Sequence, residues 1–302
     1  MTVPTYLKRG DTIAICCPAG YMNKEKIVTC VYTLQNEGYK VIVGETVGGN
    51  SQNYFSGTDE ERLTELQRFL DDKNVDAILC GRGGYGISRI IDKLCFKKFL
   101  KHPKWIIGFS DVTVIHNYIF SNFKIASLHA SMAAAFNDSG DKSENIISLL
   151  AALKGKKADY TVEANSSNKK GTATGKLIGG NLTLIANGIG TSSAIKTNKC
   201  ILFLEDLGEQ LYNIDRMLVQ LKRSDMLKNL AGLVVGGFTD LKDTERPFGK
   251  NIYEIFTDLL AEYNYPVCFD FPVSHGENNI ALKHGLKHKL IVEDDGVVLK
   301  EM

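Results

Sequence analysis

The 302-residue chain has no long apolar run and no strong charge of either sign. No stretch approaches the roughly 18 apolar residues of a membrane-spanning helix, and residues 1–11 lack the apolar core of a signal peptide. With 36 Lys and Arg against 35 Asp and Glu, the net charge of +1 indicates no surface for nucleic acid or anionic membranes. We therefore expect a cytoplasmic protein whose partners are small or peptide-like molecules, with no nucleic acid and no membrane among them.

Common metal-binding patterns are missing as well. None of the seven cysteines forms a Cys-x-x-Cys pair, and none of the six histidines lies in His-Glu-x-x-His. The cysteine count is odd and most cysteines lie in apolar runs, which favours reduced core residues. His284 and His288 are four residues apart, but Gly285 between them disfavours a helix. We expect neither a metal nor a cofactor.

Short apolar segments alternate with helical patterns in the first half of the chain. Residues 12–17, 40–44 and 75–80 have the apolar character of strands in a parallel sheet that is covered on both faces. Thr58 and Glu61 have capping-box spacing ahead of an amphipathic helix. This order predicts an α/β fold with its functional site at the carboxyl ends of the strands.

The length of the chain favours two domains. Between about residues 154 and 175 the composition shifts to Lys, Ser, Asn, Thr and Gly, as in a linker. We therefore expect an N-terminal domain over residues 1–155, a linker over 156–174 and a second α/β or α+β domain over 175–302. The second domain contains alternating strand-like and helical segments, at residues 201–204, 214–221, 233–235, 252–260 and 290–292.

A candidate nucleophile, Ser110, follows an apolar run that ends in Gly108. A serine at a strand-to-helix turn is exposed at the carboxyl edge of the sheet, where helix N–H groups face any negative charge that develops. The usual Gly-x-Ser-x-Gly pattern is half met, because Val112 stands in place of the second glycine. Taken alone, a serine in this setting is more often a helix N-cap.

The segment Gly81-Arg-Gly-Gly-Tyr-Gly86 matches the dinucleotide-binding pattern Gly-x-Gly-x-x-Gly. However, it follows the third predicted strand instead of the first, and no acidic residue ends the next strand. Backbone without Cβ can also approach a substrate closely and donate N–H groups to an oxyanion. The loop therefore fits acyl transfer at least as well as nucleotide binding.

Three carboxylates and one histidine could complete a hydrolytic site. Glu205 and Asp206 end an apolar strand, and Glu209 lies one turn further on. Glu205 is the better candidate for orienting a histidine, whereas the other two are expected to cap or solvate the next helix. His275 lies in a polar loop after a strand, so it is a candidate base. Ser, Glu and His in this chain order can form a triad, although only geometry can establish one.

Two other histidines have surroundings of a different kind. His116 lies on the helix expected after Ser110, and His129 lies in an apolar stretch. We expect both to be structural.

Six segments form a combination that is more specific than any one of them. In order along the chain, they are residues 12–20, 81–86, 107–111, 177–182, 204–206 and 274–275. Together they resemble the LD-carboxypeptidases, serine peptidases that include muramoyltetrapeptide carboxypeptidases and microcin C self-immunity proteins. The resemblance implies a flavodoxin-like N-terminal domain with the serine and a smaller, partly barrel-like α/β C-terminal domain with Glu and His. It also implies a site between the domains, often completed in a homodimer.

The resemblance implies catalytic roles for five residues. Ser110 would be the nucleophile, His275 the general base and then acid, and Glu205 the carboxylate that holds the imidazole. The backbone N–H groups of Asp111 and Gly84 would form the oxyanion hole.

Substrate contacts are implied for the glycine loop. Arg82, Gly83 and Tyr85 are expected to bind the substrate, and Arg82 or Arg89 could pair with its carboxylate, although Arg82 could instead brace the loop. The implied reaction releases terminal D-alanine from cytoplasmic murein tetrapeptide. Hydrolysis of a peptidyl or aminoacyl nucleotide is the alternative within the family. A nonenzymatic small-molecule binder and a nucleotide-dependent dehydrogenase are the alternatives outside it.

Overall fold

The computed structural model describes residues 1–49, 51–138 and 142–302, and it divides into two compact units. The first unit comprises residues 1–156 and 280–283, and the second comprises residues 157–279 and 284–302. Both units combine helices with a sheet, so the predicted α/β class is confirmed. None of the described helices has the length and apolar character needed to span a membrane.

A six-stranded sheet with the order β2-β1-β3-β4-β5-β11 forms the centre of the first unit. Its strands from β2 to β5 pair in parallel, and the order 2-1-3-4-5 is that of flavodoxin. This confirms the flavodoxin-like expectation. The strands are β1 (Thr12–Cys16), β2 (Lys40–Val43), β3 (Ala77–Cys80), β4 (Trp105–Gly108), β5 (Ser127–His129) and β11 (Leu282–His284).

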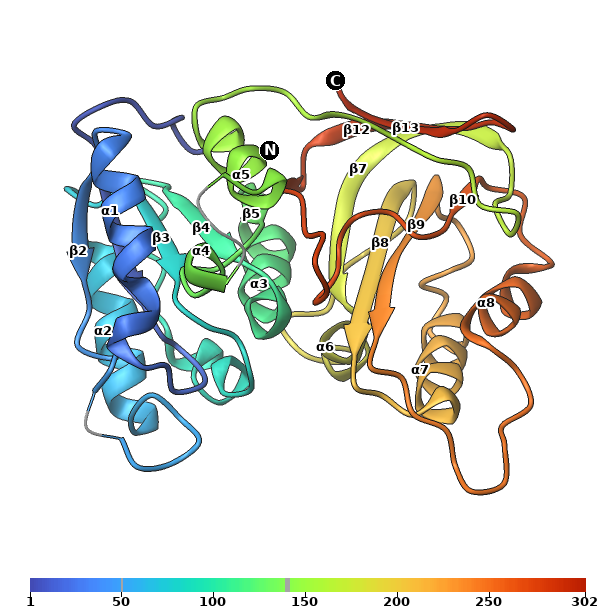
Figure 1. Ribbon diagram of the computed structural model, residues 1–302, viewed down its shortest axis with the longest axis horizontal. Helices are drawn as coiled ribbons and strands as arrows, with labels where there is room; N and C mark the ends of the chain where they lie inside the picture. Colours follow the sequence, from blue (N-terminus) through green and yellow to red (C-terminus); the bar gives the residue numbers. More distant parts are fainter. Residues whose placement is uncertain (50, 139–141) are drawn as a thin grey trace. The chain divides into compact units, whose positions relative to one another are not determined.

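Five α-helices lie between or after strands β1 to β5 in the described part of the first unit, as Figure 1 shows in blue to green. They are α1 (Val28–Asn36), α2 (Asp59–Asp71), α3 (Thr113–Phe123), α4 (Ala135–Asp138) and α5 (Glu144–Leu153). The predicted capping box is present at the start of α2, where Thr58 and Glu61 bond each other's backbone N–H groups. Strands β3 and β4 are buried along their whole length, as their unbroken apolar sequences predict.

The second unit contains a seven-stranded sheet with the order β10-β9-β8-β7-β12-β13-β6. Strands β7 to β10 are parallel neighbours, whereas β12, β13 and β6 continue the sheet with antiparallel pairs. The strands are β6 (Asp159–Val162), β7 (Gly171–Asn181), β8 (Cys200–Leu207), β9 (Gly232–Thr239), β10 (Val267–Cys268), β12 (Lys287–Val292) and β13 (Val297–Glu301). Helices α6 (Leu182–Asn187), α7 (Leu211–Arg223) and α8 (Ile252–Leu260) pack against one another in sequence.

The range 156–174, expected as a linker, contains regular structure. Strand β6 pairs with β13, and β7 begins at Gly171. Strand β6 stands at the edge of the sheet and alternates exposed with half-buried residues, so its polar composition resembles that of a loop. Residues 280–283 also belong to the first unit instead of the second, through a long-range pairing that no local pattern signals.

Candidate active site

The Ser110 turn has the backbone of a nucleophile elbow. Ser110 lies two residues after the end of β4 and has a φ of 60°, a left-handed conformation that is uncommon for a residue with a Cβ. A short 3-10 turn over Ser110–Val112 then leads into α3. The side chain of Ser110 is half-buried, whereas its neighbours on both strand and helix are buried. A strained serine at the end of a parallel strand is typical of hydrolytic sites.

The missing second glycine of the elbow has a local explanation. Gly108 has a φ of 155°, and a Cβ placed there would lie 2.8 Å from Cγ2 of Val112. The valine side chain therefore occupies the space that glycine leaves at position 108. His116 Nε2 donates to the Gly108 carbonyl at 2.8 Å, and burial lowers the pKa of His116 to about 4. This histidine is therefore neutral near pH 7 and supports the turn.

The glycine loop lies directly against the candidate nucleophile. A Cβ placed on Gly83 would stand 2.9 Å from Cβ and 3.0 Å from Oγ of Ser110, so only glycine allows this approach. The loop is held by a hydrogen bond from Gly20 N–H to the Gly83 carbonyl, 3.0 Å long. Gly84 is exposed and has a φ of 100°. Of the predicted site residues, the structure thus brings Gly83 and Ser110 together.

Tyr54 is a neighbour of this loop that the sequence patterns missed. A Cβ on Gly84 would meet the Tyr54 hydroxyl at 2.9 Å, although the tyrosine side chain is 60% exposed. Tyr85, the predicted substrate contact, is 47% exposed and lies with its ring 6.0 Å from that of Phe55. Two exposed tyrosines thus border the loop. No motif marked Tyr54, because its approach to Gly84 depends on folding of the loop before α2.

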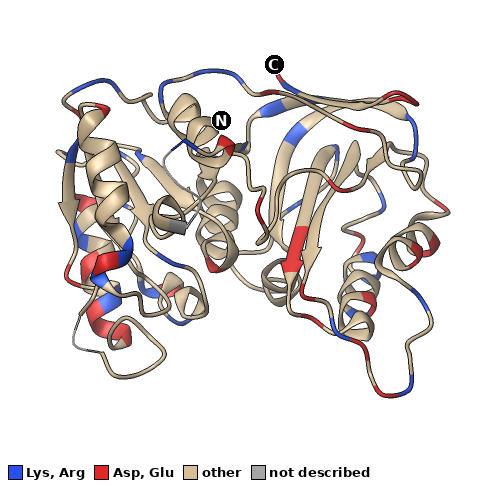
Figure 2. Ribbon diagram, in the orientation of Figure 1, with Lys and Arg blue, Asp and Glu red and all other residues tan. Residues whose placement is uncertain are grey.

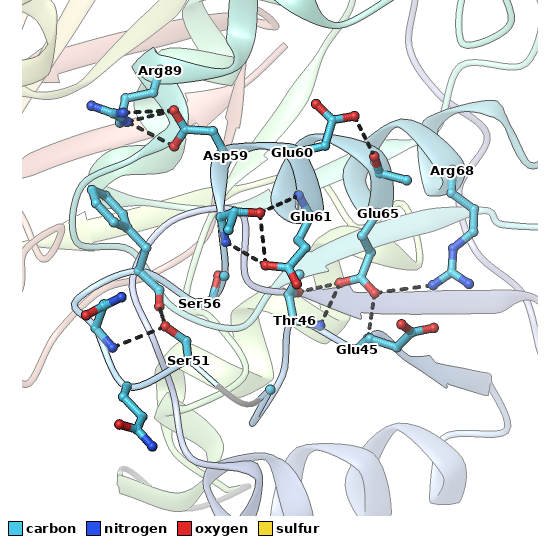
Figure 3. Close-up of a pocket in the computed structure, with 17 residues that line it drawn as sticks. Glu45, Thr46, Ser51, Ser56, Asp59, Glu60, Glu61, Glu65, Arg68 and Arg89 are labelled. Carbon is cyan, nitrogen blue, oxygen red and sulfur yellow. Dashed lines mark hydrogen bonds and ion pairs between the residues drawn. The ribbon is translucent and has the colours of Figure 1, made fainter.

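The two candidate cations have different surroundings. Arg82 is exposed and donates from Nη1 to the Tyr21 carbonyl at 2.9 Å, which matches its alternative role as a brace. Arg89 forms an ion pair with Asp59, with Nη2 at 2.9 Å from Oδ2 (Figure 3). A substrate carboxylate would therefore compete with Asp59 for Arg89. Among the residues that the structure describes, the Arg82 guanidinium bonds only the Tyr21 carbonyl, which leaves it further donors for a substrate.

Arg89 also lies at the edge of a hollow of about 1220 Å³ in the first unit. Figure 3 shows that charged side chains in its wall bind neighbouring groups. Glu65, for example, accepts from the backbone N–H of Glu45 at 2.5 Å and from Arg68 at 3.2 Å. These contacts shape the wall of the hollow and secure the backbone of residues 45 and 46.

The second unit brings together the other two predicted residues, Glu205 and His275. Nδ1 of His275 lies 2.6 Å from Oε2 of Glu205, and the carboxylate is fully buried. Since a carboxylate accepts, this contact places the proton on Nδ1 and leaves Nε2 as the basic nitrogen. Burial raises the pKa of Glu205, while the hydrogen bond with His275 acts in the opposite direction. Figure 2 marks the acidic end of β8, where Glu205 lies.

Two glycines of β9 admit the loop that carries His275. A Cβ on Gly236 would lie 2.2 Å from the Val273 carbonyl oxygen, and a Cβ on Gly237 would lie 2.5 Å from Cβ of Ser274. Gly237 N–H also donates to the Val273 carbonyl at 3.0 Å. The pairing of β8 with β9 shifts register next to Glu205. The sequence contains this glycine pair, but its role becomes visible only when the His275 loop is in place.

The other two candidate carboxylates face α6 or α7. Asp206 is 2% exposed and accepts from Asn181 Nδ2 at 2.7 Å and from the Thr183 backbone at 2.9 Å. It therefore secures the start of α6, and not the following helix as expected. Glu209 accepts from Asn213 Nδ2 on α7 at 3.0 Å. Within the described residues, no three His, Cys, Asp or Glu side chains form a group that could hold a metal ion.

Comparison with known proteins identifies the family. The pattern of the LD-carboxypeptidase N-terminal domain matches residues 13–130, and that of the C-terminal domain matches residues 174–290. Because these matches cover most of its length, the chain belongs to the LD-carboxypeptidase family, Peptidase S66.

Individual relatives cover nearly the whole chain. A probable murein peptide carboxypeptidase of Bacillus subtilis is 31% identical, over 98% of this chain and 94% of its own. The microcin C7 self-immunity protein of Escherichia coli is 24% identical, over 97% and 94%. The crystal structure of muramoyltetrapeptide carboxypeptidase from Oxalobacter formigenes has a TM-score of 0.85 at 26% identity, covering 96% and 98% of the two chains.

Proposed function

We propose that this protein is a serine carboxypeptidase that hydrolyses an L,D-amide bond and releases terminal D-alanine from murein tetrapeptide in the cytoplasm. The observation that carries the proposal is the pair of preorganised groups: Ser110 at a φ of 60° and His275 bonded to buried Glu205 at 2.6 Å. The family supports the assignment, and so do the relatives whose names specify murein peptides.

In the proposed mechanism, Oγ of Ser110 attacks the carbonyl carbon of the scissile amide while Nε2 of His275 takes the hydroxyl proton. Glu205 stabilises the imidazolium that results. The N–H groups of Asp111 and Gly84 donate to the oxyanion of the tetrahedral intermediate. The C–N bond then breaks as His275 returns the proton to the amine of D-alanine.

The second half of the reaction uses the same base. His275 deprotonates a water molecule, which attacks the ester formed on Ser110. The tetrahedral intermediate collapses, the peptide carboxylate leaves, and the serine regains its proton from the imidazolium. Arg82, Gly83 and Tyr85 are proposed to bind the substrate, with Arg82 near its carboxylate. We also propose that the protein acts as a homodimer.

Mass spectrometry of murein tetrapeptide incubated with the wild-type protein and with Ser110→Ala tests this function. Loss of one alanine with the wild type alone supports the reaction and its nucleophile, and a substrate ending in L-alanine tests the stereochemistry. His275→Ala should be inactive as well. Ordinary turnover by either folded variant would contradict the triad.

A second candidate is hydrolysis of a peptidyl or aminoacyl nucleotide. It is favoured by the microcin C7 self-immunity relative, which matches the chain over nearly its full length. The same triad would serve, because both substrates are cleaved by acyl transfer. Cleavage of an aminoacyl sulfamoyl adenosine, with no alanine released from tetrapeptide, would move the assignment to this reaction.

A further inference from the structure

The residue after the candidate nucleophile carries a buried carboxyl group. The side chain of Asp111 has no exposed surface. Burying a carboxyl group in this turn costs more free energy than burying a small uncharged side chain would. Its Oδ2 accepts a hydrogen bond from the backbone N–H of Ile87, 2.9 Å away. Ile87 is the first residue after the glycine loop. The carboxyl group therefore links the nucleophile turn to the end of the loop that lies against it.

The same peptide group is held from its other side. The Gly86 carbonyl, which shares a peptide bond with the Ile87 N–H, accepts from Nη1 of Arg62 at 3.1 Å. Arg62 is itself fully buried and also donates to the Pro18 carbonyl at 2.7 Å. Both polar groups of one peptide unit are thus bound by buried, oppositely charged side chains. Such a double contact fixes the orientation of the peptide more tightly than either bond alone.

This fixed peptide lies three residues after Gly83, which contacts Ser110. The Gly83 carbonyl accepts from Gly20 N–H at 3.0 Å, so the loop is held before and after Gly84. Gly84 and Gly86 both have positive φ, at 100° and 152°. Because glycine permits many backbone conformations, the direction of the Gly84 N–H depends on these anchors.

The electrostatics of Asp111 agree with an anchoring role. Burial raises its pKa to about 6, while the N–H groups of Ile87 and Gly86 and the charge of Arg62 favour the ionised form. Cys80 at the end of β3 has its thiol pKa raised mainly by burial, and the nearby charge of Asp111 raises it further. Asp111 is therefore largely ionised at neutral pH and makes a charge-assisted bond to Ile87.

We propose that the Asp111 side chain is a positioning residue, which aligns the glycine loop so that the Gly84 N–H points at the oxyanion formed on the Ser110 adduct. This inference rests on the proposed function. Asp111 would then have two roles. Its backbone N–H donates to the oxyanion, and its carboxylate holds the loop that supplies the second donor.

The test compares kcat and KM for D-alanine release by the wild type, Asp111→Ala and Asp111→Asn. We expect Asp111→Ala to lower kcat about 100-fold, because an oxyanion donor is misplaced, with KM changed by less than about threefold. Asp111→Asn should recover kcat to within roughly tenfold of the wild type, since the amide oxygen can still accept from Ile87.

A matched control is Glu65→Ala. Glu65 is another buried carboxylate of the first unit that accepts backbone N–H groups, those of Glu45 and Thr46 (Figure 3). The Glu65→Ala substitution should lower the midpoint of thermal unfolding, as Asp111→Ala does, but leave kcat near that of the wild type.

Three outcomes distinguish the inference from the function on which it rests. Equal kcat for the wild type and folded Asp111→Ala overturns the positioning role while D-alanine release stands. Equal losses of kcat in Asp111→Ala and Glu65→Ala overturn it too, because general destabilisation then explains both. No D-alanine release by the wild type refutes the proposed function itself.

Discussion

Glu205 and His275, 70 residues apart in sequence, meet through a 2.6 Å hydrogen bond between Oε2 and Nδ1. The carboxylate is buried, so the bond is shielded from water. It fixes both the ring orientation and the tautomer of the histidine. Both residues of this contact belong to the second unit, which therefore holds the proposed base and its orienting carboxylate.

Glu205→Gln should bind substrate with nearly unchanged KM and lower kcat by about 10³–10⁴, since the amide can neither stabilise an imidazolium nor enforce the tautomer. Steady-state kinetics of D-alanine release checks this. Glu209→Gln is the control, because Glu209 bonds Asn213 on α7 and not the histidine. If Glu205→Gln keeps wild-type kcat, another carboxylate orients His275.

Gly237→Ala should displace the His275 loop, because the new Cβ would stand 2.5 Å from Cβ of Ser274. We expect a loss of stability of about 1–3 kcal/mol and a fall in kcat of at least about tenfold. Chemical denaturation and kinetics on the same preparation measure both. Gly190→Ala is a useful comparison, since nothing lies within 4 Å of its Cβ position and any cost there comes from its φ of 84°. Wild-type kcat in Gly237→Ala would show that the loop does not depend on this glycine.

Much of the fold could be predicted because local patterns report burial directly. The unbroken apolar runs of β1, β3 and β4 indicated a sheet covered on both faces, and the capping box marked the start of α2. Strand β6 escaped detection because an edge strand with one half-buried face has no apolar run. Residues 280–283 escaped because their partner strand lies over 150 positions away in the sequence.

The candidate site was predictable where residue type alone indicates chemistry. Ser110 and His275 lie in turns after strands, Glu205 lies near the end of β8, and the structure places Nδ1 of His275 2.6 Å from Oε2 of Glu205. The supporting groups were not predictable. Arg62 lies on the polar-looking helix α2 but is fully buried, and only the folded loop shows that it binds the Gly86 carbonyl. Sequence patterns identify side chains with reactive groups, whereas backbone partners depend on tertiary structure.

Ser110 provides a test of strain at the nucleophile. A φ of 60° costs a residue with a Cβ about 1–2 kcal/mol of steric strain, which glycine does not have. Glycine, however, loses more backbone entropy on folding. We therefore expect Ser110→Gly to be more stable than Ser110→Ala by about 0.5–1 kcal/mol, with both inactive. Urea denaturation of the two variants measures the difference. A less stable glycine variant would mean that the turn is not strained at this position.

Asp111 should make stability depend on pH in a defined direction. Its pKa is raised from 3.8 to about 6 in the folded protein, so between these values the folded state binds more protons than the unfolded state. The free energy of unfolding should therefore fall as pH rises through this window, by at most about 3 kcal/mol. Asp111→Asn cannot titrate, so it should gain stability relative to the wild type between pH 4 and pH 7. Urea denaturation of both proteins across this range isolates the contribution of Asp111, because all other titrating groups are shared. If the difference in free energy of unfolding between the two proteins stays constant with pH, Asp111 does not titrate in this window. Burial of its ionised carboxylate would then lack the expected cost.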